Sequence, residues 1–127
     1  MPVSLQDSEV DNHAGGPVDV SPTAAEAGFS MPVSLTAAAW SDCVAWSVDD
    51  SRRQLALDEQ ARLWHVLDMA AQAFLLLPDL TARMLFPVFR VPRDGFSTDA
   101  REATLQAILA TEGGEPAVTI MLRHETA

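Results

Sequence analysis

The sequence predicts an α+β fold, in which an antiparallel β-meander of about three to five strands packs against one long helix at residues 58–77. The prediction rests on a long helical apolar pattern, a strand-like run after it, and two further strand-like runs joined by Gly113-Gly114. A shorter helix that carries two tryptophans is predicted at residues 36–47, with Thr36 as its N-cap.

Residues 58–77 are the longest run with helical spacing that contains neither glycine nor proline. Asp58 and Glu59 place negative charge in the first turn, where the helix dipole favours it, and Pro78 ends the run. Its apolar residues recur every three or four positions, as expected when one helix face is buried. They are Leu63, Val66, Leu67, Ala70, Ala73, Phe74 and Leu77. We expect this helix to be the scaffold of the fold rather than the carrier of its chemistry.

The end of the chain predicts a β-hairpin, because residues 104–111 and 116–123 are strand-like and flank Gly113-Gly114. A two-residue turn would pair Leu105 with Leu122, and it would pair Ala107 with Ile120 and Leu109 with Val118. These six apolar residues then share one face of the hairpin. On the other face, the apolar Ile108 and Met121 are either covered by another part of the chain or mark a contact surface. The candidate interaction surface consists of Ile108, Met121, Gln106, Thr119 and Arg123.

Three further segments have simpler interpretations. Residues 84–91 are rich in aromatic and β-branched residues and predict a strand. Pro87 has no N–H to donate, so this strand should lie at an edge or carry a bulge. Residues 47–53 predict a solvated polar turn, although a carboxylate pair beside an arginine pair also suits a metal or a phosphate. Residues 96–102 predict a linker.

Residues 1–30 contain acidic residues but no basic one, and Gly15-Gly16-Pro17 and Ser21-Pro22 interrupt any periodicity. Such a segment buries too little apolar surface to offset its chain entropy. It predicts a disordered acidic arm, with a tail that folds on a partner as the alternative. Residues 1–5 recur letter for letter as residues 31–35, so Met31 is an alternative start. Residues 31–127 are predicted to form a single domain.

The composition narrows the class of protein. A net charge of −10, from 18 acidic and 8 basic residues, argues against direct nucleic-acid binding. One cysteine, Cys43, excludes an intramolecular disulfide and a cysteine-cluster zinc site. No apolar run is long enough to cross a membrane, and the first residues lack the positive charge of a signal peptide. We expect a cytoplasmic protein without cofactor or metal; a homodimer is compatible with the sequence.

Candidate catalytic residues are few. His65 and Asp68 stand three positions apart on the predicted helix, which is the minimum for general-base chemistry, but no nucleophile or metal ligand accompanies them. Cys43 lies between Trp40 and Trp46 without a neighbouring histidine, and we interpret it as a buried hydrophobic residue. No catalytic residue is therefore assigned.

Several short motifs lie between residues 31 and 124: Val33-Ser34-Leu35, Trp40-Ser41-Asp42-Cys43, Ser51-Arg52-Arg53, Arg62-Leu63-Trp64, Arg90-Val91-Pro92-Arg93-Asp94-Gly95, and Glu115-Pro116 with Val118-Thr119-Ile120-Met121-Leu122. This pattern resembles an uncharacterised family of small proteins of unknown function from actinobacteria and their phages or plasmids. The resemblance leaves out the acidic arm. It implies a mobile-element or host-accessory setting. It assigns no activity, cofactor or catalytic residue to this chain.

Three functions remain open. The preferred one is a non-enzymatic small acidic accessory or regulatory protein that acts through contact with a protein partner, because no catalytic or metal-ligating constellation has a recognisable spacing. The alternative is an acidic inhibitor that mimics nucleic acid and blocks a host or defence nuclease. The second alternative is a small enzyme that uses His65 with Asp68 or His124, with Arg52 or Arg90 binding an anion.

Overall fold

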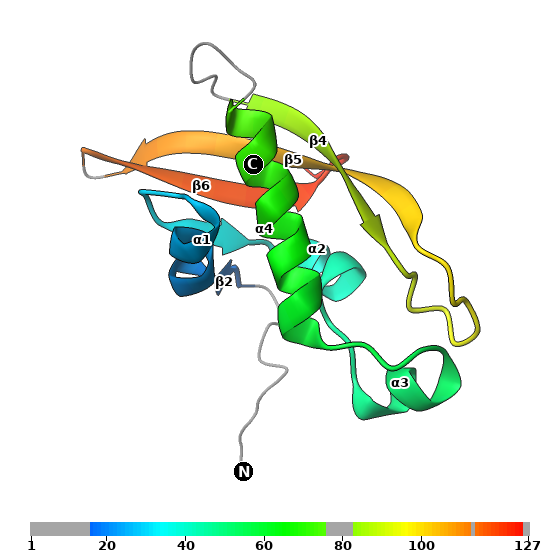
Figure 1. Cartoon of the computed structure of the whole chain (residues 1–127). Helices are drawn as coiled ribbons and strands as arrows, with labels where there is room; N and C mark the ends of the chain where they lie inside the picture. The colour runs from blue at the N-terminus through cyan, green and yellow to red at the C-terminus, as the bar shows by residue number, and fades with distance from the viewer. Residues whose placement is uncertain (1–15, 76–82, 113, 126–127) are drawn as a thin grey trace.

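The structure, a computed structural model, describes residues 16–75, 83–112 and 114–125. It has an α+β fold with a five-stranded mixed sheet in the order β2-β3-β6-β5-β4 (Figure 1). The strands are β2 (Val18–Asp19), β3 (Val33–Leu35), β4 (Arg83–Arg90), β5 (Arg101–Glu112) and β6 (Glu115–Leu122). The helices are α1 (Ser21–Ala27), α2 (Ala37–Cys43), α3 (Val48–Arg53) and α4 (Glu59–Leu75).

The predicted antiparallel meander is correct for β4, β5 and β6 but wrong for the sheet as a whole. β3 pairs with β6 in parallel, so that Val33 lies opposite Val118 and Leu35 opposite Ile120. Parallel neighbours need a long crossover connection, and here three helices and the β4–β5 hairpin separate the two strands in the chain. A short strand far from its partner in sequence gives no local signal of its direction.

The prediction of a disordered arm is wrong for residues 16–30. β2 pairs antiparallel with β3, and Val20 and Ala24 are buried with exposed fractions of 4% and 0%. Pro22 stands in the first turn of α1, where a missing N–H breaks no helical hydrogen bond. A few apolar residues suffice here because α1 packs on a surface that α4 already provides. The folded part thus begins before the predicted boundary at residue 31; residues 1–15 lie outside the described residues.

The helices differ in part from their predicted ranges. α4 is the longest described helix and crosses one face of the sheet (Figure 1), while residues 76–77 of the predicted range lie outside the described residues. The hydroxyl of Thr36 accepts a hydrogen bond from the Ala39 N–H at 3.2 Å, as predicted for an N-cap, but α2 ends at Cys43 rather than at residue 47. The predicted polar turn is instead α3, because Ser47 and Asp50 form a capping box.

The hairpin register is confirmed: Leu105 lies opposite Leu122, and the other two predicted pairs also match. β5 begins at Arg101, inside the predicted linker, because it pairs with the whole length of β4. β4 is an edge strand, as Pro87 requires. Gly114 has φ +89°, the left-handed conformation that a tight hairpin turn favours, whereas Gly113 lies outside the described residues.

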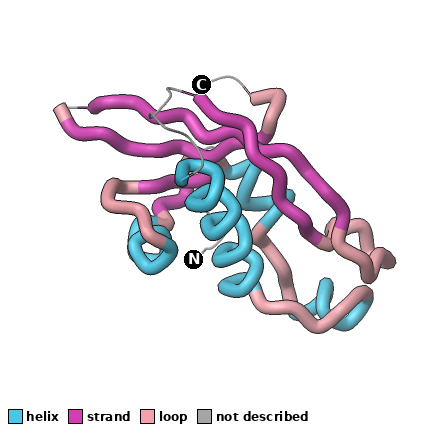
Figure 2. The backbone as a smooth tube through the Cα atoms, turned by 45° about the horizontal axis from the view of Figure 1, so that its top comes forward, coloured by secondary structure: helices cyan, strands magenta, loops and turns pink. Residues whose placement is uncertain are grey.

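The core lies between one face of the sheet and the helices. Every second residue of β4 is buried, and these residues meet the apolar stripe of α4 together with buried residues of the other strands. Each such side chain contributes about 1.5–3 kcal/mol to the free energy of unfolding. Figure 2 shows the helices gathered on this side of the sheet, so no described helix covers the opposite, outer face.

Candidate functional site

The outer face of the sheet contains a groove of about 670 Å³ across β3, β6 and β5. On its floor, Ile108 lies opposite Thr119 and Ala110 opposite Ala117 in the β5–β6 ladder. Ala110 and Ala117 have short side chains, which leave the sheet uncovered where longer ones would fill the space. Its edges are formed by residues before β2 and by the first residues of α2: Gly16, Pro17, Ala37 and Ala38.

The groove is nearly uncharged, although the whole chain has a net charge of −10. Among the described residues that line it, Glu125 is the charged one. Its Oε1 accepts hydrogen bonds from the Thr36 hydroxyl at 2.7 Å and from the Leu122 N–H at 2.8 Å. The Glu125 carboxylate is thus occupied in holding the turn after β6, and the remaining lining is apolar with hydroxyl groups.

The structure brings together three of the five residues predicted as an interaction surface. Ile108, Thr119 and Met121 line the groove, with Ile108 and Thr119 half-buried and Met121 only 3% exposed. Met121 therefore belongs to the floor and is not the exposed contact residue that the hairpin pattern predicted. Gln106 and Arg123 do not line the groove.

Gln106 is a buried structural residue, with 2% of its surface exposed. Its Nε2 donates to the backbone carbonyl groups of Leu122, Arg123 and Glu125 at 3.0, 3.2 and 2.7 Å. Its Oε1 accepts from Nε of Arg83 at 2.6 Å. The prediction of Gln106 as a contact residue is wrong, because the turn after β6 folds back over it, which a strand pattern cannot show.

The sequence pattern missed a second apolar group on the outer face. Leu85 and Phe89 are 45% and 47% exposed on the edge strand β4. The other alternation of the strand, Met84, Phe86 and Val88, is buried. Since both alternations of β4 are apolar, periodicity could not tell which one faces solvent.

Arg62 ties α4 to the end of α2 and to the residue after β4. Its Nε donates to the Val44 carbonyl at 3.0 Å, Nη1 to the Val91 carbonyl at 3.1 Å and Nη2 to the Asp42 carbonyl at 3.5 Å. The guanidinium also lies 4.5 Å from the ring centroid of Trp46. Arg62 is only 7% exposed, and burial lowers its pKa from the usual value. No carboxylate of the described residues lies within ion-pair distance of it.

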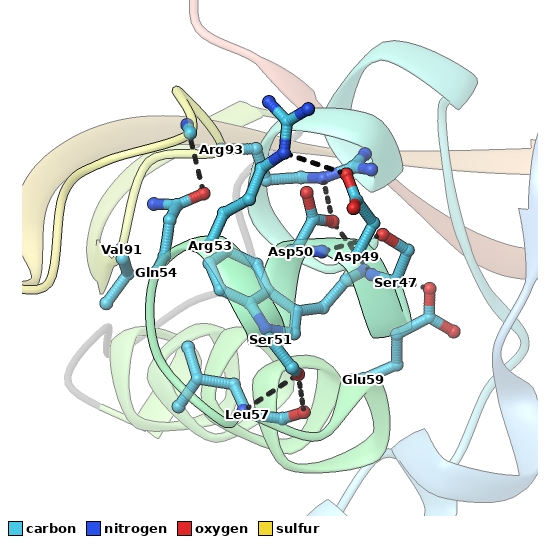
Figure 3. Close-up of polar contacts among 12 residues, drawn as sticks. Ser47, Asp49, Asp50, Ser51, Arg53, Gln54, Leu57, Glu59, Val91 and Arg93 are labelled. Atoms are coloured by element: carbon cyan, nitrogen blue, oxygen red, sulfur yellow. Dashed lines mark hydrogen bonds and ion pairs between the residues drawn. The ribbon is translucent and has the colours of Figure 1, made fainter.

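Next to Arg62, α3 holds the loop after β4 (Figure 3). Asp50 accepts hydrogen bonds from the Ser47 N–H at 2.8 Å and from Nε of Arg93 at 2.9 Å. Gln54 donates to the carbonyl groups of Pro92 and Ser97 at 2.6 and 2.7 Å, and it accepts from the Gly95 N–H at 3.2 Å. Asp50 and Gln54 thereby connect α3 and its C-cap to the loop after β4, so this segment has a structural role. No group of three metal-ligating residues occurs in the part of the chain that the structure describes.

His65 lines a smaller cleft, of about 200 Å³, between α4 and β4. Its Nε2 accepts the Phe89 N–H at 3.0 Å and so covers part of the free edge of β4. Asp68 instead accepts from the Gln72 amide at 3.0 Å, and His124 lies on the turn after β6. The structure therefore does not assemble the predicted His65–Asp68 pair.

Cys43 also lines this cleft, beside Arg90. Burial raises the pKa of the Cys43 thiol to about 12; Asp42 raises it further, while Arg90 and Arg62 lower it. A thiol with this pKa stays protonated near neutral pH, where a nucleophilic cysteine must be a thiolate. Of the two arginines predicted as anion ligands, Arg90 lines the cleft, whereas Arg52 does not.

No described helix combines the length and the apolar character needed to cross a bilayer. Comparisons of the chain with protein-family models, with curated proteins and with solved structures find no match. The resemblance to the actinobacterial family therefore stays a prediction.

Proposed function

We propose that this chain is a non-enzymatic accessory or regulatory protein that works in the cytoplasm by binding an uncharged, apolar segment of another protein in its outer groove. The observation that carries this proposal is the largely apolar lining of the groove, with Glu125 as its one charged described residue, in a strongly acidic chain. A phage or plasmid setting comes from the resemblance alone.

The chemistry of the groove favours a protein partner. Interface cores are depleted of charged residues, and burial of apolar surface supplies about 25 cal/mol per Å². The groove offers Ile108, Ala110 and Ala117 for such burial, with the hydroxyl groups of Ser34 and Thr119 for hydrogen bonds. A charged partner surface would lose its hydration there without meeting an opposite charge.

A mimic of nucleic acid is a weaker reading of the same protein. Such an inhibitor needs free carboxylates held at regular intervals. In this chain, three carboxylates of the described residues are instead paired with arginines. Asp42 pairs with Arg90 at 3.1 Å, and Asp49 and Asp50 pair with Arg53 and Arg93 at 3.0 and 2.9 Å. An enzyme is also less well supported, since His65 is bonded to the backbone and the Cys43 thiol is protonated.

The direct test is site-specific photo-crosslinking in the source cell. A benzoylphenylalanine in place of Ala110 reports on the groove, and the same residue in place of Leu85 is a matched control on the same sheet face outside it. We expect one protein adduct from position 110 and none from position 85. An adduct between two copies of this chain would replace the proposed partner by a homodimer, and the absence of any adduct from position 110 would contradict the proposal.

The partner identified in this way then permits a quantitative test. Ala110→Glu should weaken its binding at least about tenfold, because a charge enters the apolar centre of the contact, while Leu85→Glu should leave it unchanged. Calorimetry at low and high salt distinguishes the two readings. Apolar binding should hardly change with salt, whereas binding by a nucleic-acid mimic should weaken steeply.

A further inference from the structure

We propose that the cleft between α4 and β4 binds a small organic carboxylate with a compact apolar body, held by the guanidinium groups of Arg62 and Arg90 and by His65. The cleft shares no lining residue with the outer groove. This inference therefore does not depend on the proposed function, and either one can fail without the other.

The first argument is the unmatched charge of Arg62. A guanidinium has five N–H donors, and the contacts of Arg62 to carbonyl groups use three of them. These carbonyl groups are dipoles and carry no net charge, and no described carboxylate forms an ion pair with Arg62. Buried charges are normally paired, so a ligand carboxylate would supply the missing counter-charge through charge-assisted hydrogen bonds.

The second argument is the hydrogen-bonding state of His65. Because its Nε2 accepts the Phe89 N–H, the proton of a neutral imidazole sits on Nδ1, an assignment that follows from this bond. Among the described residues, nothing accepts a hydrogen bond from Nδ1. His65, which lines the cleft, thus has a ring N–H without a described acceptor, and such a donor suits an acceptor-only group such as a carboxylate.

The two guanidinium groups at the cleft favour an anion near Arg62, and the carboxylates of Asp42 and Asp58 oppose it. Arg90 adds a second guanidinium, which its ion pair with Asp42 at 3.1 Å holds in place. Asp58 opposes an anion, but it is exposed and its carboxylate accepts the Ala61 N–H at 3.3 Å. Water and salt screen this exposed carboxylate more than they screen the buried Arg62.

The size and the walls of the cleft define the rest of the ligand. Leu57, Ala61, Phe89, Val91 and Ala100 give it apolar walls, and its volume is about 200 Å³. An engineered apolar cavity of about 150 Å³ in another protein accommodates benzene, whereas drug-sized ligands need about 300 Å³ or more. The cleft thus fits a body the size of a benzene ring and is too small for a nucleotide.

Benzoate, benzamide and benzamidine test this proposal, because the three share one shape and carry negative, zero and positive charge. The backbone amide of Phe89 and the indole N–H of Trp46 serve as NMR reporters, since the first is bonded to His65 and the second belongs to the ring stacked on Arg62. We expect saturable shifts with benzoate at a Kd on the order of 1 mM and at least about fivefold weaker binding of the other two. Inorganic phosphate, which lacks the apolar body, should give no saturable shift at these reporters. Equal binding of benzoate and benzamide, or no binding of benzoate, would overturn the proposal.

Two substitutions at one exposed lining position locate the site. Ala61→Leu should fill the cleft and abolish benzoate binding, while Ala61→Ser keeps the space open and should bind as the unmodified protein does. Both retain the contacts of Arg62, and matching thermal unfolding curves would show that the fold is intact. Arg90→Gln removes one guanidinium and should weaken benzoate binding by about fivefold. If Ala61→Leu bound benzoate normally, the ligand would lie elsewhere.

Discussion

The outer groove and the polar junction differ in how their side chains are used. The polar junction consists of Arg62, Asp50 and Gln54 with the residues that they contact. At the junction, the side chains of Arg62 and Gln54 donate to backbone carbonyl groups at the end of α2 and in the loop after β4, and Gln54 also accepts the Gly95 N–H. In the groove, the short side chains of Ala110 and Ala117 leave apolar surface uncovered. The contacts of the junction therefore stabilise the folded chain itself. The apolar surface of the groove contributes stabilising free energy only when a partner buries it.

This difference predicts how the two regions respond to change. Substitutions at the junction should lower the free energy of unfolding, since they leave buried carbonyl groups or carboxylates without partners. Substitutions in the groove should leave stability nearly unchanged and affect binding instead.

Arg62→Met should have the largest effect on stability. The substitution keeps an unbranched apolar side chain in the core but removes all donors to the carbonyl groups of Val44, Val91 and Asp42. We expect a loss of about 3–5 kcal/mol, because three carbonyl groups lose their donor and each buried polar group left unsatisfied costs about 1–3 kcal/mol. Arg62→Lys should restore little of it, because one ammonium group cannot reproduce the fork of a guanidinium. Urea unfolding followed by tryptophan fluorescence measures both variants, and a loss below about 1 kcal/mol would contradict the assigned role.

The second-largest effect on stability should come from acid, which weakens the contacts of the loop after β4. The side chain and the N–H of Ser97 lower the pKa of Asp94 to about 2. Burial raises the pKa of Asp50, but hydrogen bonds from Ser47 and Arg93 outweigh it and the net shift is downward. A carboxylate with a lowered pKa in the folded state stabilises the fold fully above its unfolded pKa near 4, and this contribution is lost as the pH falls through the folded value.

The expected outcome is a loss of stability between about pH 4 and pH 2, together with a lower protection factor of the Ser97 N–H, that is, exchange that is less slowed relative to the intrinsic rate at the same pH. Asp94→Asn should flatten this dependence, because the amide does not titrate. Thermal unfolding and NMR-detected exchange across this pH range are the measurements. A stability that is constant over this range, or an unchanged slope in Asp94→Asn, would show that these carboxylates do not support the loop.

The sequence predicted those parts of the fold that depend on local patterns. The register of the β5–β6 hairpin, the Thr36 cap of α2 and the edge position of Pro87 each follow from residues close together in the chain. The parallel pairing of β3 and the docking of α1 depend on surfaces that distant residues supply. For that reason neither was found from the sequence.

The sequence also predicted only part of the candidate site. The pattern of the hairpin identified Ile108, Thr119 and Met121 as outward-facing, but it could not show that the turn after β6 would bury Gln106. The contacts of Arg62 were invisible because each acceptor is a backbone carbonyl, which carries no trace in the sequence. The paired carboxylates and arginines at 49–53 suggested a turn or a ligand site, and the structure shows a capped helix instead.

Ala110→Glu should change stability least and so gives the sharpest contrast with Arg62. Ala110 is exposed and lies opposite Ala117 at the groove, where a longer side chain meets open space instead of the core. Glutamate is a weaker strand former than β-branched residues but differs little from alanine, so we expect a change within about 0.5 kcal/mol. Urea unfolding measures this value, and the same purified variant is the one that should lose the partner in the binding experiment. A variant that unfolds easily would show that the groove supports the fold, whereas a stable variant with lost binding would show that its uncovered surface is kept for contact with another protein.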